Sequence, residues 1–188
     1  MKRLSQITLL ASAISLALMT SACGNNASEA SSSSSVQGEA SDTVSTPKST
    51  ASGAEFTDGV LETNDLKIEI TDVRKLAIGD EGNEYGEKPV IAFWYNTTNK
   101  TDEPMPPNGW IWHFDAVQDN DPNKVNELEV TSHPDMSLID NSFEDIKPGG
   151  TVPDAIGYEL DDETTPVKLV ASLDFGSEDI GAQSFQIP

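Results

Sequence analysis

The residues best suited to bind a metal ion lie in a short polar stretch in the second half of the chain. Asp119, Asp121 and Asn123 alternate there with other residues and offer carboxylate and amide oxygens. Hard cations such as Ca²⁺ prefer these ligands, and a calcium loop of the EF-hand type begins with the same spacing. However, Lys124 stands where that loop needs a glycine, and Val130 stands where it needs a glutamate. Two interpretations remain open: a calcium site, or a polar loop without a cofactor.

The two histidines offer little for catalysis. His113 and His133 are predicted on different elements, and no motif places a serine beside either of them. A hydrolytic triad needs a nucleophile, a base and an orienting group in contact, and a zinc site needs several converging ligands. His113 with Asp115 is more typical of a hydrogen-bonded pair on one strand face. The sequence therefore predicts that the protein is not an enzyme.

The single cysteine, Cys23, stands at the end of an export signal. Lys2 and Arg3 precede an uncharged apolar stretch at 7–19, which is too short to span a bilayer. Small residues then lead to Cys23, and this junction resembles the lipobox of bacterial lipoproteins, although Thr20 stands where leucine is usual. The resemblance implies that Cys23 carries a diacylglyceryl group with fatty acyl chains such as palmitate. Cleavage would then leave Cys23 as the new N-terminus.

Three regions follow from this interpretation: a signal peptide at 1–22, a lipidated tether at 23–54 and a folded domain at 55–188. The tether is rich in serine and other small or polar residues, and such a segment buries too little apolar surface to offset its ordering entropy. We therefore expect a disordered spacer that holds the domain on the extracellular face of the cell membrane. The lipid on Cys23 is the predicted contact with the membrane.

The folded domain carries the charge of the chain. Residues 55–188 contain 29 Asp and Glu against 8 Lys and Arg, which accounts for the formal charge of −21. Nucleic acids and anionic lipids are bound by basic patches, so this composition argues against both as ligands. Two interpretations remain for the acidity: solubility, or a site for a cation or a basic partner.

Alternating apolar residues predict an all-β domain. The strongest runs lie at 66–71, 89–95, 110–117, 152–160 and 167–173, with short pieces near 128–131, 143–146 and the C-terminus. About eight strands with intervening glycine and proline turns favour a sandwich. Residues 104–109 are rich in proline and predict a crossing without a helix. A type II turn is expected at 147–150, and a short helical turn is possible at 177–182.

The three tryptophans allow two interpretations. Trp94, Trp110 and Trp112 could form a platform for stacking sugars, or they could fill the core between two sheets. Tryptophan on the inner face of a sandwich strand is typical of core. We therefore expect Trp94 and Trp112 in the core with Ile68 and Leu169.

Short motifs in order along residues 55–188 support a family resemblance. They are Phe56 with Asp58 and Gly59, Ile68 with Ile70, Thr71 and Val73, Asn99 to Thr101, Gln118 with Asp119, Ile146 to Gly149, Tyr158 to Leu160, and Thr165 to Val167. This part of the chain resembles the C-terminal immunoglobulin-like domain of a group of Gram-positive bacterial lipoproteins, a domain of unknown function. The resemblance implies an immunoglobulin-like antiparallel β-sandwich on a lipid anchor, and it implies no activity.

The function predicted from these observations is non-covalent binding. We expect a cell-surface lipoprotein that presents its sandwich to a protein or an envelope polymer, whose identity the sequence leaves open. A structural or assembly role in the cell envelope is one alternative, and a calcium-dependent module is another. An aromatic cluster exposed in loops would favour binding, whereas an evenly acidic surface would favour the structural role. An enzyme is the least favoured alternative, and polar side chains that converge in a pocket would favour it.

Overall fold

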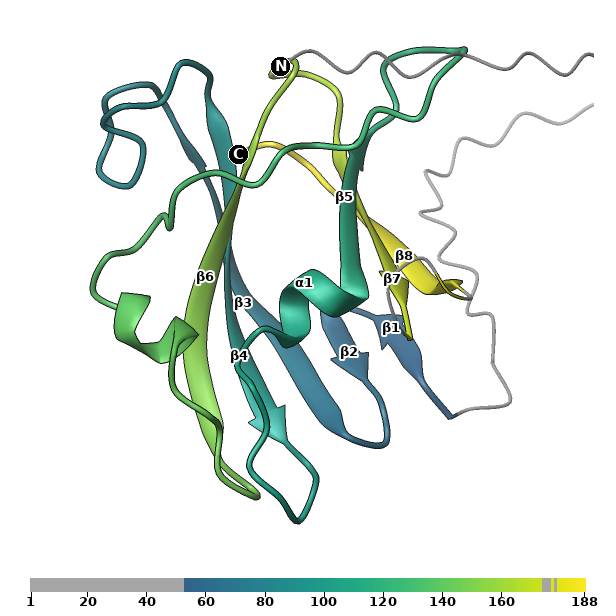
Figure 1. Ribbon diagram of the computed structural model, residues 1–188. Helices are drawn as coiled ribbons and strands as arrows, with labels where there is room; N and C mark the ends of the chain where they lie inside the picture. Colours follow the sequence, from purple (N-terminus) through teal and green to yellow (C-terminus); the bar gives the residue numbers. More distant parts are fainter. Residues whose placement is uncertain (1–52, 174–176, 178) are drawn as a thin grey trace, which may run out of the picture. The chain divides into compact units, whose positions relative to one another are not determined.

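The computed structural model describes residues 53–173, 177 and 179–188, so the predicted signal peptide, Cys23 and most of the tether lie outside the described residues. Strands dominate the described part (Figure 1). In chain order the elements are β1 (Glu55–Thr57), β2 (Val60–Glu62), β3 (Leu66–Leu76), β4 (Val90–Asn99), α1 (Gly109–His113), β5 (Phe114–Gln118), the 3₁₀ helix η1 (Ile139–Ser142), β6 (Thr151–Glu159), β7 (Val167–Ser172) and β8 (Asp179–Phe185).

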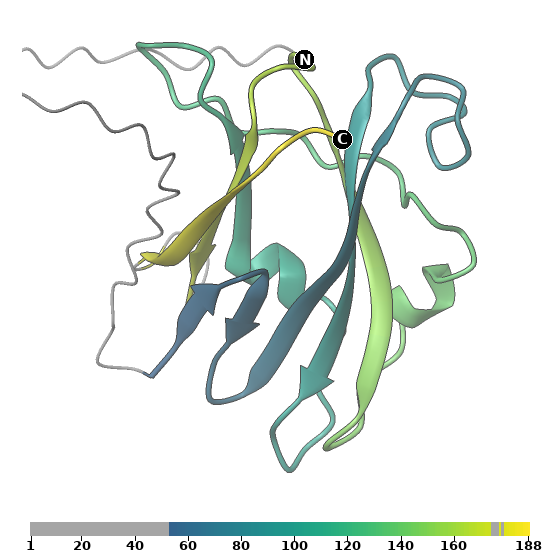
Figure 2. The same cartoon turned by 180° about the vertical axis from the view of Figure 1, so that it is seen from behind.

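Two antiparallel sheets pack face to face, which confirms the predicted sandwich. One sheet has the order β1-β2-β3-β4-β6 and the other has the order β5-β7-β8. Seen from behind, β1 lies beside β8 where the two sheets approach each other (Figure 2). The chain crosses between the sheets through α1, and it returns through the long segment that contains η1.

The central strand β4 shows how the core is built. Its residues alternate, so Ile91, Phe93 and Tyr95 enter the core cluster, while Trp94 points to the outer face and is only half-buried. Side chains alternate across a strand, so Trp94 cannot join the core that its two neighbours fill. The prediction that Trp94 is a core residue was therefore wrong, whereas Ile68 and Leu169 are fully buried as expected.

The segment at 109–113 differs from the prediction. It was expected to be the first part of a strand, but it forms the single turn of helix α1, and β5 begins only at Phe114. Residues two apart lie on opposite sides of a helix, so Trp110 is fully buried while Trp112 is 40% exposed. The expected core role of Trp112 was wrong, whereas the proline-rich crossing at 104–109 is free of helix up to Asn108, and only its last residue, Gly109, belongs to α1.

The ends of the domain differ from expectation in two further ways. The short strands β1 and β2 were not predicted, although Asp58 and Gly59 form the hairpin between them with positive φ angles of 51° and 76°. An Asp-Gly pair is the usual residue choice for such a turn. Near the C-terminus, residues 179–182 belong to β8, because they pair with β7, so the expected helical turn was wrong there.

The turn at 147–150 confirms its prediction. Gly149 has a φ of +70°, and the N–H of Gly150 donates to the carbonyl of Lys147 at 2.8 Å. Proline at the second position and glycine at the third are what a type II turn requires. This turn leads the chain into β6, the strand that carries one wall of the site described below.

Candidate functional site

A buried carboxylate on β6 organises the candidate site. Asp154 is 7% exposed, and it points inward beside Tyr95 of β4, its partner across the sheet. Its oxygens accept hydrogen bonds from the His133 Nε2 (2.8 Å), the Ser142 hydroxyl (2.9 and 3.1 Å) and the Tyr95 hydroxyl (3.4 Å). The backbone N–H of Ala155 also donates to it, at 2.9 Å. Asp154 therefore fixes the segment around His133 and η1 against the edge of the sheet.

The hydrogen bonds of His133 define its tautomer. The backbone N–H of Asp135 points to the His133 Nδ1 at 3.1 Å, and an amide N–H can only donate. The Nδ1 atom must therefore be the acceptor, and the Nε2 atom carries the proton that is donated to Asp154.

Although serine, histidine and aspartate meet here, their order is not that of a hydrolytic triad. In a triad the histidine accepts the serine proton and the aspartate orients the histidine. In this protein the Ser142 hydroxyl donates to Asp154, and both nitrogens of His133 are already engaged. Ser142 therefore has a carboxylate and not a histidine as its acceptor, and the cluster ties η1 to β6.

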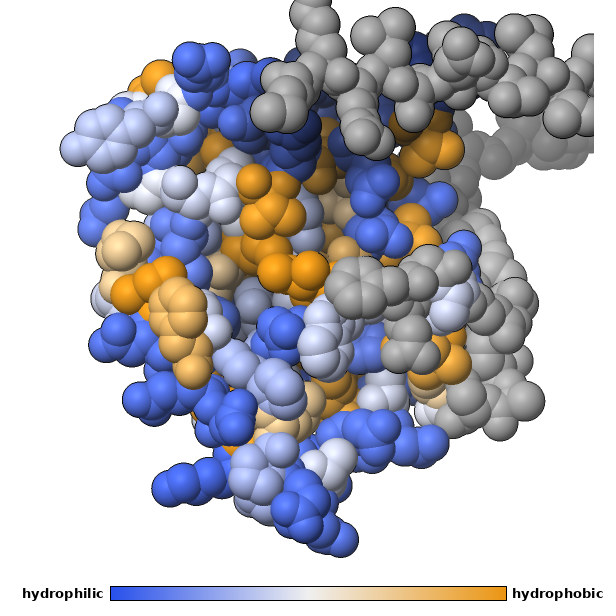
Figure 3. Space-filling model, viewed as in Figure 1, coloured by the Kyte–Doolittle hydropathy of each residue, from blue (hydrophilic) through white to orange (hydrophobic). Residues whose placement is uncertain are grey.

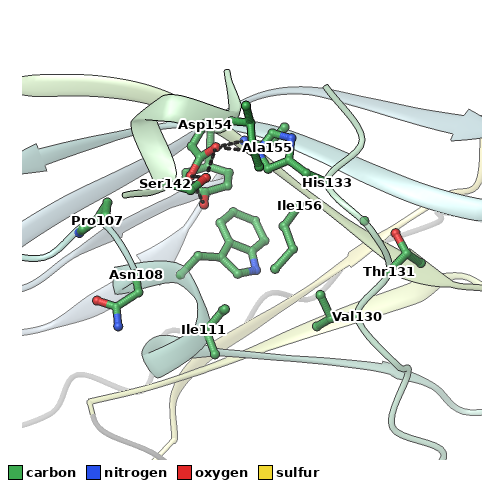
Figure 4. Close-up of a pocket in the computed structure, with 14 residues that line it drawn as sticks. Pro107, Asn108, Ile111, Val130, Thr131, His133, Ser142, Asp154, Ala155 and Ile156 are labelled. Carbon is green, nitrogen blue, oxygen red and sulfur yellow. Dashed lines mark hydrogen bonds and ion pairs between the residues drawn. The ribbon is translucent and has the colours of Figure 1, made fainter. Parts of the chain in front are cut away.

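A cavity of about 230 Å³ opens beside this cluster. We call it the Trp110 cavity. Figure 4 shows Asp154, His133 and Ser142 together at one end, with Ile111 and Val130 at the other. The remaining lining side chains are mainly apolar or aromatic, and they include Tyr95, Pro107, Asn108, Trp110, Thr131, Ile139, Ala155 and Ile156. The cavity therefore has an apolar body and one polar end, as ligand sites commonly do.

Two apolar side chains mark the mouth of the Trp110 cavity. Ile111 on α1 is 51% exposed, and Val130 on the crossing segment is 52% exposed. Figure 3 shows apolar side chains gathered near the middle of this face, among hydrophilic ones. This domain is highly acidic, so exposed apolar side chains beside a cavity, such as Ile111 and Val130, are candidates for an interaction site.

The aromatic side chains around the cavity are firmly held. The Trp110 indole donates to the Tyr158 hydroxyl at 2.8 Å, and its ring lies 4.5 Å from the ring of Tyr95, centroid to centroid. Burial raises the pKa of Tyr158, and burial together with the Asp154 charge raises the pKa of Tyr95. Both phenols therefore stay neutral at physiological pH and keep the wall of the cavity in one arrangement.

A second cluster lies on the outer face of the larger sheet. The Trp94 indole donates to the Asp135 Oδ2 at 3.0 Å, and the Arg74 guanidinium carbon lies 4.5 Å from the centroid of the indole ring. The Ser137 hydroxyl and the Trp94 indole lower the pKa of Asp135. Since Arg74 already stacks on this ring, the geometry does not favour Trp94 as a sugar platform.

The structure places the predicted metal ligands in an exposed loop after β5. The Asn123 backbone N–H donates to the Asp121 Oδ1 at 2.8 Å, and the Lys124 Nζ lies 3.4 Å from the Asp121 Oδ2. The first of these contacts lowers the pKa of Asp121 the most. Asp119 is exposed nearby. Lysine already provides the positive charge at Asp121, so calcium binding by this loop stays a prediction.

The sequence did not predict that the residues of the cavity come together. His113 and His133 lie apart, as expected, but His113 is buried with its Nδ1 2.8 Å from the Ser172 carbonyl and is not paired with Asp115. The usable sequence feature was Asp154. It lies in step with Ile156 and Tyr158 on a strand face that should be apolar. A carboxylate at such a position needs buried hydrogen-bond partners, which makes it a candidate centre for a site.

One solved structure shares this fold, and a second gives a weaker match. A structure described as "a putative lipoprotein from Staphylococcus aureus subsp. aureus NCTC 8325" matches with a TM-score of 0.59 and 20% identity, over 71% of this chain and 91% of that chain. An "uncharacterized beta-sandwich protein" from Clostridium difficile 630 matches with a TM-score of 0.45 and 14% identity, over 70% of this chain and 93% of that chain.

The other comparisons concern the sequence and its family. No curated protein matches this chain. None of the described helices is long and apolar enough to cross a membrane. A family model described as "Domain of unknown function (DUF5067)" matches residues 41–172, which is more than half of the sequence. Because the match covers more than half of the sequence, the chain belongs to the DUF5067 family.

Proposed function

We propose that this protein is a lipid-anchored surface protein whose immunoglobulin-like domain binds a protein or an envelope polymer non-covalently and catalyses no reaction. The observation that carries the proposal is the Trp110 cavity, with exposed Ile111 and Val130 at its mouth. The polar cluster around Asp154 holds that cavity open in a single arrangement, and a preformed site reduces the ordering cost of binding. Among the described residues, Ser142 donates to a carboxylate and not to a histidine, so the cluster lacks the order of a hydrolytic triad, which favours binding over catalysis.

The strand order supports the immunoglobulin-like assignment. In that fold one sheet has the order A-B-E-D and the other has the order C-F-G. Here β3-β4-β6 correspond to A-B-E, and β5-β7-β8 correspond to C-F-G. An isolated bridge from Val130 to Tyr158 stands at the edge of β6, where strand D would pair. The mouth of the cavity thus lies beside a position that the fold normally fills with a full strand.

The lipid anchor is the second part of the proposal. It is supported by the junction before Cys23, and by the likeness of the domain to the structure described as a lipoprotein in Staphylococcus aureus. We expect Cys23→Ala to release the protein into the medium or to leave an uncleaved precursor, because one cysteine thiol would carry the only lipid attachment. Mass spectrometry of the wild-type N-terminus should show an acylated cysteine. An unmodified N-terminus beyond Cys23 on cell-retained protein would refute the anchor.

The binding site is tested by placing a charge at the mouth of the cavity. We expect Ile111→Lys to reduce capture of envelope components by the purified full-length protein about tenfold, because an ammonium group would be desolvated in the interface. Ile78→Lys is the matched control, since Ile78 is 57% exposed and does not line the cavity. The measurement is quantitative mass spectrometry of the captured material. Equal capture by both variants would place the binding site elsewhere or favour the structural role.

Calcium dependence remains a second candidate. The oxygens of Asp119, Asp121 and Asn123 favour it, although the contact between Asp121 and Lys124 opposes it. A cation bound only by the native state would raise the melting temperature above that in sodium chloride of equal ionic strength. That comparison separates a specific site from the general screening of a highly acidic domain.

A further inference from the structure

Asp154 has no Lys or Arg ion-pair partner within the part of the chain that the structure describes. The basic group in contact with it is His133, whose Nε2 lies 2.8 Å from the Asp154 Oδ1. The Ser142 and Tyr95 hydroxyls and the Ala155 N–H also donate to its oxygens. Asp154 therefore places a buried acidic group at the inner end of the Trp110 cavity, with no Lys or Arg beside it.

The rest of the cavity suits a cation with an apolar stem. None of the eight Lys and Arg residues lines it. Two aromatic residues, Tyr95 and Trp110, line it instead, and aromatic rings favour nearby cations. Ile111 and Val130 provide an apolar entrance. A lysine or arginine side chain matches this arrangement of an apolar entrance and an acidic inner end. Its methylene stem packs on apolar surface, and its head carries the positive charge.

Acidic residues also flank the lining residues along the chain. Glu129 and Asp140 are exposed, and each is the sequence neighbour of a lining residue, Val130 or Ile139. Asp115 and Glu127 lie close enough to contribute to the raised pKa of Tyr158, whose hydroxyl contacts Trp110. Opposite charges at the rim of a site steer the partner and select against partners of the same charge. An anionic polymer would be repelled from this face.

The size of the cavity decides between a free small molecule and a polypeptide side chain. Pockets for small ligands enclose about 300–1,000 Å³, whereas the Trp110 cavity encloses about 230 Å³. It therefore accepts a single large side chain, and the rest of the partner must lie outside on the acidic rim. Resting on the function proposed above, we propose that the Trp110 cavity binds one lysine or arginine side chain of a basic polypeptide, with its charged head towards Asp154.

The proposal is tested with three short peptides that differ in one side chain. The probes are acetyl-Ala-Lys-Ala-amide, the same peptide with norleucine in place of lysine, and the same peptide with glutamate. Norleucine keeps the apolar stem and lacks the charge. We expect titration of the full-length protein, followed by NMR of the Trp110 indole N–H, to show binding of the lysine peptide about tenfold tighter than that of the norleucine peptide. The glutamate peptide should not bind, and added salt should weaken the lysine complex.

Three variants separate the cavity from general attraction by an acidic surface. Asp154→Asn should remove the preference for lysine over norleucine, and Ile111→Lys should abolish binding of both peptides by placing a cation at the mouth. Ile78→Lys adds the same charge at a similarly exposed position outside the cavity and should leave binding nearly unchanged. Because Ile111→Lys alters only an exposed side chain, the test does not depend on the fold tolerating Asp154→Asn.

The outcomes distinguish this inference from the function on which it rests. Equal binding of the lysine and norleucine peptides at the cavity would overturn the inference and leave the proposed binding function standing. Equal weakening by Ile111→Lys and Ile78→Lys would also overturn it, since the attraction would then belong to the whole surface. If no peptide binds and Ile111→Lys does not change envelope capture, both the inference and the proposed site fail.

Discussion

Replacing Trp110 with alanine is expected to destabilise the domain by about 3–5 kcal/mol. Trp110 is fully buried, and its ring centroid lies 4.5 Å from those of Tyr95 and Phe114. The substitution would open a large void in the middle of this aromatic cluster. It would also remove the indole donor from the Tyr158 hydroxyl, which is buried with it. The measurement is urea unfolding of the full-length protein, followed by circular dichroism.

The other tryptophans provide matched controls for this substitution. Trp112 is 40% exposed on the opposite side of α1, so Trp112→Ala should cost about 1 kcal/mol or less. Trp94→Ala should cost an intermediate amount, because the ring is half-buried and donates to Asp135. Equal losses for Trp110→Ala and Trp112→Ala would contradict the assignment of Trp110 as the central residue of the core.

Replacing Asp154 with alanine is expected to have the second large effect, a loss of about 3 kcal/mol or more. The change leaves His133, Ser142 and Tyr95 without their common acceptor in a buried place. The segment that contains η1 would lose its main polar attachment to β6. We therefore expect faster amide hydrogen exchange at residues 133–142, in addition to the lower free energy of unfolding.

Two variants check whether this effect comes from the hydrogen bonds of Asp154. Asp154→Asn keeps one acceptor oxygen and should lose less stability than the alanine variant. Asp140→Ala removes an exposed carboxylate from η1 itself and should change stability by about 0.5 kcal/mol or less. If Asp140→Ala is as costly as Asp154→Ala, then Asp154 does not organise this segment.

The sandwich could be predicted from the sequence because its strands follow strong local patterns. The alternation around Ile68, the apolar run of β4 and the repeat around Leu169 each indicate one strand, and tertiary contacts do not overrule them. The turn at 147–150 was equally readable, since only glycine accepts its positive φ without strain. Two-residue periodicity and turn chemistry are thus enough for the fold class.

The local departures have a common physical reason. Trp110 and Trp112 fit a strand by spacing, but the chain must cross from one sheet to the other there, and a single helical turn makes that crossing. The packing of Gly109 supports this, because an added Cβ would lie 3.1 Å from the Leu66 side chain. Such a requirement comes from the placement of two sheets, which no local pattern contains.

The candidate site could not be predicted for the same kind of reason. His133, Ser142 and Asp154 come from a loop, a 3₁₀ helix and a strand, and only tertiary packing brings them together. No spacing rule connects these positions. Only Asp154 could have been recognised from the sequence, because it is a carboxylate on an apolar strand face. It marks the buried centre of the site, but the sequence does not indicate which residues contact it.

The most direct test of the central claim is a contact measured on living cells. A photo-cross-linking amino acid would replace Ile111 at the mouth of the Trp110 cavity in the full-length protein, and in a control it would replace the similarly exposed Ile78. The proposed function predicts a discrete cross-linked product at position 111 that is absent at position 78. The cross-linked partner should carry a basic segment if the further inference also holds. Identical products at both positions, or none at position 111, would contradict the claim that this cavity is where the protein binds.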